Sequence, residues 1–265
     1  MRQPEVNIAA KAAWKAGNAL LRLQKQAQTM PVTQKRDNDF SSLADKTAEE
    51  IIIQTIKQAY PDHAILAEES GQQGDAEYVW IIDPLDGTTN FLHGFPHFAI
   101  SLALRHNGVI EHGVVFDPVR DETFYASRGK GAFVNDQRIR VNQKQRLAGA
   151  LLATGFPFRN RRFFNQYMRQ FKTLFKQASD IRRAGSAALD LAYVAAGRVD
   201  GFWEMGLEIW DMAAGSLLVT EAGGQCMDFK ASQDFLENGH IIAGNLHVVA
   251  DMYNKLHQLE IDPTA

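Results

Sequence analysis

The chain has 265 residues, of which 45% are hydrophobic and 22% are charged, and its formal net charge is −3. This length and composition allow one large domain or two close lobes with a full core, and they exclude intrinsic disorder. The single cysteine, Cys226, excludes an internal disulfide framework and a thiolate zinc cage. The chain has neither an apolar leader nor a run of eighteen apolar residues, so we expect a cytoplasmic protein that does not enter a membrane.

Basic residues are concentrated in one segment. Residues 128–183 contain fourteen Lys and Arg but only two acidic residues, Asp136 and Asp180, so the remainder of the chain is strongly acidic. Such a segment is usually a solvated helix face that also helps to hold phosphate, but it can also bind a polyanionic partner.

Two amphipathic helices are predicted in the first quarter of the chain. Residues 6–28 form the first, and residues 48–59 show a clear 3.6-residue apolar period that Pro61 ends. Thr47 and Glu50 have the spacing of a capping box, so we expect the second helix to begin there.

Short apolar runs then predict buried strands. Residues 64–67 and 78–82 are too short for helices, and each run ends abruptly in acidic residues. Strand and hairpin patterns follow between residues 98 and 134. The first half is therefore predicted to be a sheet with helices.

After Gly149 strands and helices alternate, which is typical of layered α/β packing. We predict an α/β fold with two lobes, residues 1–145 and residues 146–265, in one compact unit. The predicted strands cover 151–156, 199–205 and 240–244 and lie near Ile181, and the predicted helices cover 163–175, 186–196 and 212–221, with a last helix after them.

The most informative segment is WIIDPLDGTTNF, residues 80–91, in which an apolar strand stops at Asp83 and Asp86 follows. Glu68 and Glu69 end the neighbouring predicted strand. Like charges at such positions repel one another and raise each other's pKa unless cations neutralise them. Oxygen ligands without His or Cys favour Mg²⁺, so the pattern predicts a magnesium site.

The residues after these acids suit a phosphate group. Gly87, Thr88 and Thr89 stand where the chain turns from strand to helix, so their backbone N–H groups can hold an anion. The hydroxyl of Thr88 can also orient a water nucleophile.

Each acid alone also has a structural interpretation. Asp83 and Asp86 can make a turn and cap a helix, and Asp211 can be the N-cap of the helix that follows it. The combination of apolar strand, two acids, glycine and paired hydroxyls favours the functional interpretation. For Asp211, the apolar Ile209 and Trp210 before it favour a metal ligand.

The residues resemble the inositol monophosphatase family in three segments: EES at 68–70, WIIDPLDGTTNF at 80–91 and WDMAAGSLLVTEAGG at 210–224. Matching segments run in family order from Lys35 to Gly244, and residues 182–201 look closest to the bacterial branch. The resemblance implies a five-layer α/β/α/β/α sandwich of the sugar-phosphatase fold, a homodimer, a site between the lobes, and inhibition by lithium.

The resemblance also implies roles for individual residues. Two or three Mg²⁺ ions would bind, the first through Glu68, Asp83 and the carbonyl of Leu85, and the second through Asp83, Asp86 and Asp211. A water activated by the metal and oriented by Glu68 and Thr88 would attack phosphorus in line, with Asp86 in the catalytic set. The phosphate and the polyol of the substrate would contact Gly87, Thr88, Gly185, Ser186, Ala187, Glu204 and Asp211.

One segment departs from the family pattern. Where the family often has Val-Thr-x-x-Asp, this chain has Ser41, Ser42, Leu43, Ala44 and Asp45. Asp45 matches an acid near an additional metal position, and Ser42 can replace the first hydroxyl, so the roles of Lys35, Asp45 and a third metal stay open.

Other mechanisms find less support. An aspartyl-phosphate mechanism needs a second Asp two residues after the nucleophile, whereas Asp83 and Asp86 are three apart. No GxSxG, GxxxxGK[ST] or HExxH motif supports a serine hydrolase, a P-loop kinase or a zinc peptidase. Glu204 suits hydroxyl recognition, so inositol or sugar monophosphates rank ahead of fructose bisphosphate and nucleotide 3′-phosphates as substrates.

A regulatory binding protein is the alternative from another class. The bacterial branch of the family includes a member that joins RNA polymerase and Nus factors in transcription antitermination. The basic segment, with Arg182 and Arg183 at its end, can face RNA or the polymerase. One chain can carry both functions.

Overall fold

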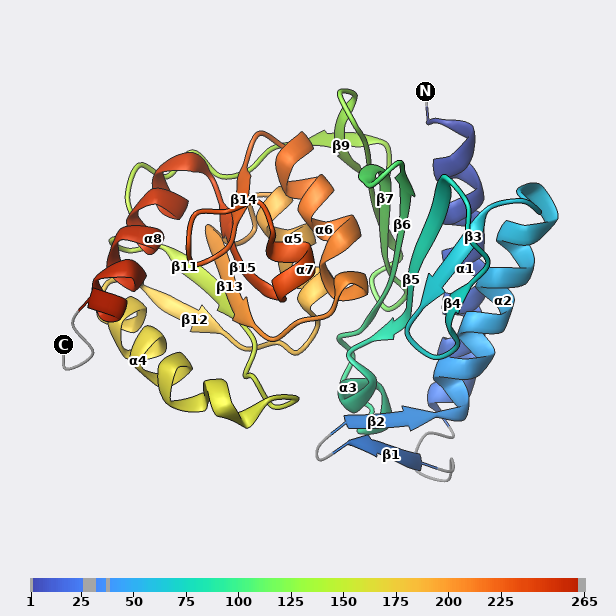
Figure 1. Ribbon diagram of the computed structural model, residues 1–265, viewed down its shortest axis with the longest axis horizontal. Helices are drawn as coiled ribbons and strands as arrows, with labels where there is room; N and C mark the ends of the chain where they lie inside the picture. The colour runs from blue at the N-terminus through green and yellow to red at the C-terminus, as the bar shows by residue number, and fades with distance from the viewer. Residues whose placement is uncertain (1, 26–31, 37–38, 262–265) are drawn as a thin grey trace.

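The computed structural model describes residues 2–25, 32–36 and 39–261 (Figure 1). Its larger sheet has eight strands in the order β10-β9-β8-β7-β6-β5-β3-β4, and all neighbours are antiparallel except β3 and β5. The strands are β3 (Ala64–Ala67), β4 (Gly71–Gln73), β5 (Tyr78–Asp86), β6 (Ala99–His106), β7 (Val109–Asp117), β8 (Glu122–Ser127), β9 (Gly131–Val134) and β10 (Gln137–Ile139).

The second half of the chain forms a five-stranded sheet in the order β12-β11-β13-β15-β14. Strand β11 is parallel to its neighbours β12 and β13, and strand β15 is antiparallel to its neighbours β13 and β14. The strands are β11 (Leu151–Thr154), β12 (Asp180–Arg182), β13 (Gly201–Met205), β14 (Gln225–Met227) and β15 (His240–Gly244).

Three layers of helices alternate with the two sheets, as Figure 1 shows. The outer layers are α1 (Pro4–Gln24) with α2 (Leu43–Ala59) on the larger sheet, and α4 (Phe164–Phe175) with α8 (Leu246–Ile261) on the smaller one, while α5 (Ala187–Ala195) and α6 (Ile209–Glu221) lie between the sheets. The shorter elements are β1 (Val32–Arg36), β2 (Asp39–Ser42), α3 (Thr88–Leu92), the 3₁₀ turn η2 (Arg161–Phe163) and α7 (Phe235–Asn238). The predicted five-layer α/β/α/β/α sandwich is confirmed.

Strand β5 is apolar on both faces because its side chains alternate between two helix-covered cores. Trp80 and Ile82 belong to the core that contains α1 and α2, whereas Ile81 belongs to the central core with α5 and α6. A strand covered by helices on both sides reads as a continuous apolar run rather than an alternating one. The central layer also lies close to the sheet, because a Cβ added at Gly113 of β7 would lie 2.9 Å from the carbonyl oxygen of Ala214 in α6.

Two predicted helix starts were wrong. Helix α2 begins at Leu43, and the hydroxyl of Thr47 donates a hydrogen bond to the Leu43 carbonyl, so Thr47 lies inside the helix and forms no capping box with Glu50. Helix α6 begins at Ile209, three residues before the predicted start. The start of α2 precedes its first strongly periodic residues, and α6 starts before Asp211, the residue that the sequence offered as its N-cap.

The strands predicted at 64–67 and 78–82 are confirmed, and β5 continues to Asp86. The first helix ends at Gln24 rather than at residue 28. The chain passes from the larger sheet to the smaller one between Ile139 and Leu151. A division into lobes at residue 145 stays a proposal, because α5 and α6 contribute to a core that both sheets share.

Among the helices in the described ranges, none combines the length and the apolar character that a membrane crossing requires.

Candidate functional site

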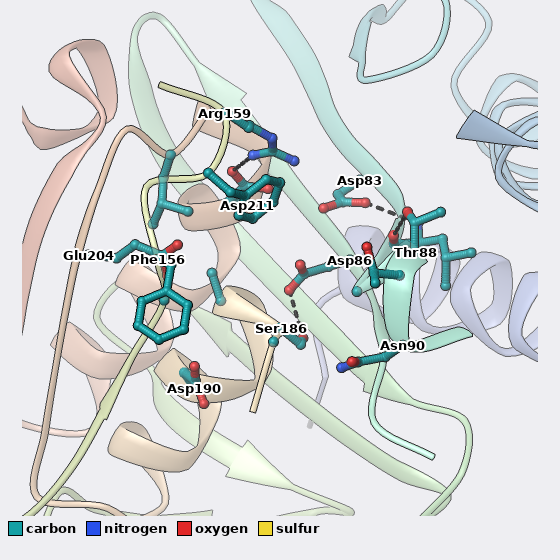
Figure 2. Close-up of a pocket in the computed structure, with 18 of the residues that line it drawn as sticks. Asp83, Asp86, Thr88, Asn90, Phe156, Arg159, Ser186, Asp190, Glu204 and Asp211 are labelled. Atoms are coloured by element: carbon teal, nitrogen blue, oxygen red, sulfur yellow. Dashed lines mark hydrogen bonds and ion pairs between the residues drawn. The ribbon is translucent and has the colours of Figure 1, made fainter. Parts of the chain in front are cut away.

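A pocket of about 320 Å³ opens between the two sheets, where β5, α3, α5, β13 and α6 converge (Figure 2). It brings together almost every residue that the sequence singled out. The predicted residues that line it are Glu68, Asp83, Leu85, Asp86, Gly87, Thr88, Arg183, Gly185, Ser186, Ala187, Glu204 and Asp211. Asp45 and Arg182 are not among the lining residues.

An extra residue in β5 places Asp83 and Asp86 on the same side of the sheet. Asp83 pairs with Ser101 of β6, and Asp86 pairs with Ala99, so three steps on β5 oppose two steps on β6. Without this bulge, side chains three residues apart on a strand would point to opposite faces. Pro84 is tolerated there because a bulge leaves one residue out of the hydrogen-bond ladder.

The parallel pairing of β3 with β5 adds Glu68 to the same edge. Ala67 lies opposite Ile82, so the next residues of the two neighbouring strands, Glu68 and Asp83, come to the same end of the sheet. The backbone N–H of Glu68 donates a hydrogen bond to the Ile82 carbonyl at 3.1 Å, which fixes the point where Glu68 leaves the strand.

Protein donors hold one oxygen of Asp83 and one of Asp86. The Oδ1 atom of Asp83 accepts a hydrogen bond from the Leu85 N–H at 3.0 Å, and Oδ2 of Asp86 accepts from the Ser186 hydroxyl and the Ala188 N–H, both at 2.7 Å. The second oxygen of each carboxylate has no donor among the described residues. Donors around a carboxylate fix its orientation as a metal ligand.

Asp211 reaches the cluster from the central helix layer. It is the third residue of α6 rather than its N-cap, and its Oδ2 accepts the Glu208 N–H at 2.8 Å in a capping box. Asp83, Asp86 and Asp211 each offer one oxygen, and these three oxygens lie within 4.8 Å of one another. Three carboxylate oxygens at this spacing fit a hard divalent cation such as Mg²⁺.

Burial and mutual repulsion raise the pKa values of Asp83 and Asp86. Burial is the main cause of a pKa well above the ordinary range at Asp83, followed by the charges of Glu68, Asp86 and Asp211. Burial, then the charge of Asp211, raises the pKa of Asp86 to about 7, although the hydrogen bonds from Ser186 and Ala188 oppose the change. A cation that binds here removes the cause of the repulsion.

Sequence reasoning missed Arg159, which already brings a positive charge to the acids. Its Nη1 atom donates to Oδ2 of Asp211 at 2.8 Å, and its Nη2 atom lies 3.8 Å from Oε1 of Glu68. Arg159 lies in the loop between β11 and the 3₁₀ turn η2. A basic residue shortly after a predicted strand was the sequence signal that could have identified it as a site residue.

Thr88 links the acids to Asp45 at the start of α2. The Thr88 hydroxyl lies 2.9 Å from Oδ1 of Asp45 and 3.0 Å from the Leu85 carbonyl oxygen, and it can donate to one of them at a time. Gly87 precedes it with a φ of 95°, and a Cβ there would lie 3.1 Å from the Gly185 carbonyl oxygen. Only glycine suits this conformation and this close approach.

The other end of the pocket contains two further acids. Glu204 of β13 was predicted, whereas Asp190 of α5 was not, because its apolar helical surroundings read as core. Burial raises the pKa of Glu204 to about 8 and holds the pKa of Asp190 well above its ordinary range. Asn90, which belongs to the WIIDPLDGTTNF segment but was given no role of its own from the sequence, donates to the carbonyls of His97 and Ala184 at 2.7 and 2.9 Å and so ties α3 to the loop before α5.

The two arginines predicted for partner contacts lie in different surroundings. Arg182 is exposed and forms an ion pair with Asp180 on the edge strand β12. Arg183 lines the mouth of the pocket, where its guanidinium carbon lies 5.1 Å from the ring centroid of Phe156. Arg183 is therefore placed to meet whatever enters the pocket.

The raised pKa values predict how stability depends on pH and on metal. In EDTA the free energy of unfolding should fall between about pH 4 and about pH 7, because Asp86 ionises near 3.8 when unfolded but near 7 when folded. Over this range the unfolded state binds fewer protons, so rising pH favours it. Mg²⁺ should reduce the fall, since it binds the ionised carboxylates. Thermal unfolding in EDTA and in MgCl₂ measures the difference, and equal falls in both would contradict a cation site.

Comparisons with known proteins show which family the chain belongs to. The family model described as "Inositol monophosphatase family" matches residues 1–261. The chain is 53% identical over 249 residues to Nus factor SuhB of Pseudomonas aeruginosa, with 92% of each chain covered. It is 46% identical to the crystal structure of extragenic suppressor protein suhB from Bartonella henselae, with a TM-score of 0.91 and 94% and 97% of the two chains covered.

A third similar protein is an inositol monophosphatase from Anabaena, whose structure matches with a TM-score of 0.85 and 40% identity over 96% of this chain and 95% of that one. The family match spans nearly the whole chain, and these relatives are covered almost end to end. The chain belongs to the inositol monophosphatase family.

Proposed function

We propose that this protein hydrolyses the phosphate monoester of inositol or a similar small polyol or sugar, with two or three Mg²⁺ ions at the site. The observation that carries the proposal is the set of three carboxylate oxygens within 4.8 Å of one another, at one end of a pocket whose other end contains Glu204. Bound Mg²⁺ would supply positive charge to the phosphate oxygens and lower the pKa of a water nucleophile.

The chain's own residues would divide the remaining work. Asp83, Asp86 and Asp211, with Glu68 and the Leu85 carbonyl, would hold the ions. The hydroxyl of Thr88 would orient the water, because it is itself positioned by Asp45 and Leu85, and Glu68 would accept the proton. The N–H groups of Gly87 and Thr88 would contact the phosphate. The pocket residues Gly185, Ser186, Ala187 and Glu204 would contact the polyol.

The Asp86→Asn variant tests the enzyme proposal. The amide oxygen of Asn can still accept the hydrogen bonds from Ser186 and Ala188, so the fold should persist, but the lost negative charge should weaken the metal site and reduce hydrolysis by several orders of magnitude. The measurement is Mg²⁺-dependent phosphate release from inositol 1-phosphate. Asp75→Asn, at an exposed acid outside the pocket, is the matched control. Near wild-type activity in Asp86→Asn would refute the metal assignment.

A role in transcription is the second candidate. The relatives from Pseudomonas aeruginosa and Escherichia coli are called Nus factor SuhB, and we propose that this chain also acts in the cytoplasm beside RNA polymerase, Nus factors or RNA. The basic segment 128–183 supports the proposal, because Lys172 of α4, Lys176 directly after α4 and Arg182 of β12 are exposed. Large exposed apolar side chains, including Phe164, Met168 and Phe175 of α4, support a homodimer.

Salt dependence tests an electrostatic contact with RNA. Retention of RNA should weaken between low and physiological salt, because each neutralised phosphate releases counterions. Arg182→Glu combined with Lys172→Glu should reduce retention, whereas Arg22→Glu, at an exposed base of α1, should not. Arg183 is left unchanged because it lines the pocket. Retention that is insensitive to salt or to the double substitution would rule out this contact.

A further inference from the structure

Asp190 and Glu204 form a second acidic group in the pocket, separate from the metal acids. Figure 2 shows both residues to the left of Asp86, whereas Asp83 lies above it. Asp190 comes from α5 and Glu204 from β13, so the group spans the central helix layer and the smaller sheet. Both residues line the pocket, although their exposed fractions are only 3% and 7%.

Neither carboxyl group has a hydrogen-bond or ion-pair partner within the ranges that the structure describes. The three metal acids differ in this respect, since each accepts at least one hydrogen bond from the protein. A buried carboxyl group without a partner reduces the stability of the fold, and buried polar groups in proteins are almost always paired. A partner from outside the chain, bound in the pocket, would explain why both acids are present.

The surroundings keep these two groups available to a ligand. A Cβ at position 155 would lie 2.1 Å from Oε1 of Glu204, so Gly155 provides the space that the Glu204 carboxyl occupies. The guanidinium carbon of Arg183 lies 5.1 Å from the ring centroid of Phe156. Its positive charge partly opposes the rise that burial causes in the pKa of both acids. The pocket therefore offers two acceptor groups beside one guanidinium donor.

We propose that Asp190 is a specificity residue, which together with Glu204 accepts hydrogen bonds from two hydroxyl groups of the substrate's leaving group. Hydroxyl groups suit this site because each can donate to a carboxyl oxygen and also accept from a guanidinium such as that of Arg183. A leaving group without hydroxyls would bury both acids unsatisfied, which is how such sites reject close analogues. This inference rests on the proposed function and narrows its substrate to a hydroxylated ring.

Matched substrates and matched variants test the proposal. Inositol 1-phosphate and cyclohexyl phosphate share a ring and a phosphate but differ in the ring hydroxyls. Asp190→Leu keeps the branched shape and removes the acceptor, so it should raise KM for inositol 1-phosphate about tenfold or more. It should lower KM for cyclohexyl phosphate, because one acid that this substrate leaves unsatisfied is gone. Asp190→Asn, which retains one acceptor oxygen, should recover most of the loss.

Thermal unfolding separates this role from a structural one. Replacing an unpartnered buried carboxyl group should leave the melting temperature of both Asp190 variants equal to or above that of the wild type. Asp228→Asn is the control, because Asp228 is a buried acid outside the pocket whose carboxylate accepts hydrogen bonds from Lys230, Ser232 and Asn238. This control should lower the melting temperature and leave the preference between the two substrates unchanged.

A binding measurement distinguishes failure of the inference from failure of the proposed function. Saturation-transfer NMR in the presence of inorganic phosphate should show myo-inositol bound to the wild type and not to Asp190→Leu. If this holds but neither phosphate ester is hydrolysed, the proposed function fails and the hydroxyl site stands. Equal losses on both substrates, a lowered melting temperature in both Asp190 variants, or binding of myo-inositol that is independent of Asp190 would overturn the inference.

Discussion

Repulsion among buried carboxylates is the constraint on which the rest of this structure depends. Asp83, Asp86 and Asp211 offer oxygens within 4.8 Å of one another, and burial together with neighbouring charge raises the pKa of Asp83 and Asp86. Such a cluster disfavours folding unless donors orient it and a cation neutralises it. The bulge in β5 places Asp83 and Asp86, the Ser186 hydroxyl and the Ala188 N–H hold Asp86, and the capping box of α6 orients Asp211.

The same contacts join the two halves of the chain. Ser186 and Ala188 from the second half hold Asp86 from the first, and Asn90 donates to Ala184 across the same boundary. The metal acids are thus assembled only when the central helix layer lies against the larger sheet. This arrangement couples the geometry around Asp86 to that around Asp190 at the other end of the pocket, because Asp190 lies on the same helix as Ala188.

The resemblance implied the family and the layer order, and the acids at the end of β5 could be predicted from the residues themselves, because apolar runs ending in acids such as Asp83 are local signals. Asp190 could not, since a single acid in an apolar helix is indistinguishable from a capped or paired one until its surroundings are known. Arg159 lies in a loop 76 residues after Asp83, and only the packing of the two sheets brings it to Asp211. The start of α2 was misplaced because Thr47 and Glu50 imitate a capping box inside the helix.

Anomalous diffraction from crystals soaked in Mn²⁺, which binds oxygen ligands much as Mg²⁺ does, tests the metal centre most directly. The account predicts a peak at about 2.0–2.3 Å from the oxygens of Asp83, Asp86 and Asp211 that accept no hydrogen bond from the protein. A peak elsewhere, or none at a saturating concentration, would contradict the claim that these acids are arranged to hold a divalent cation.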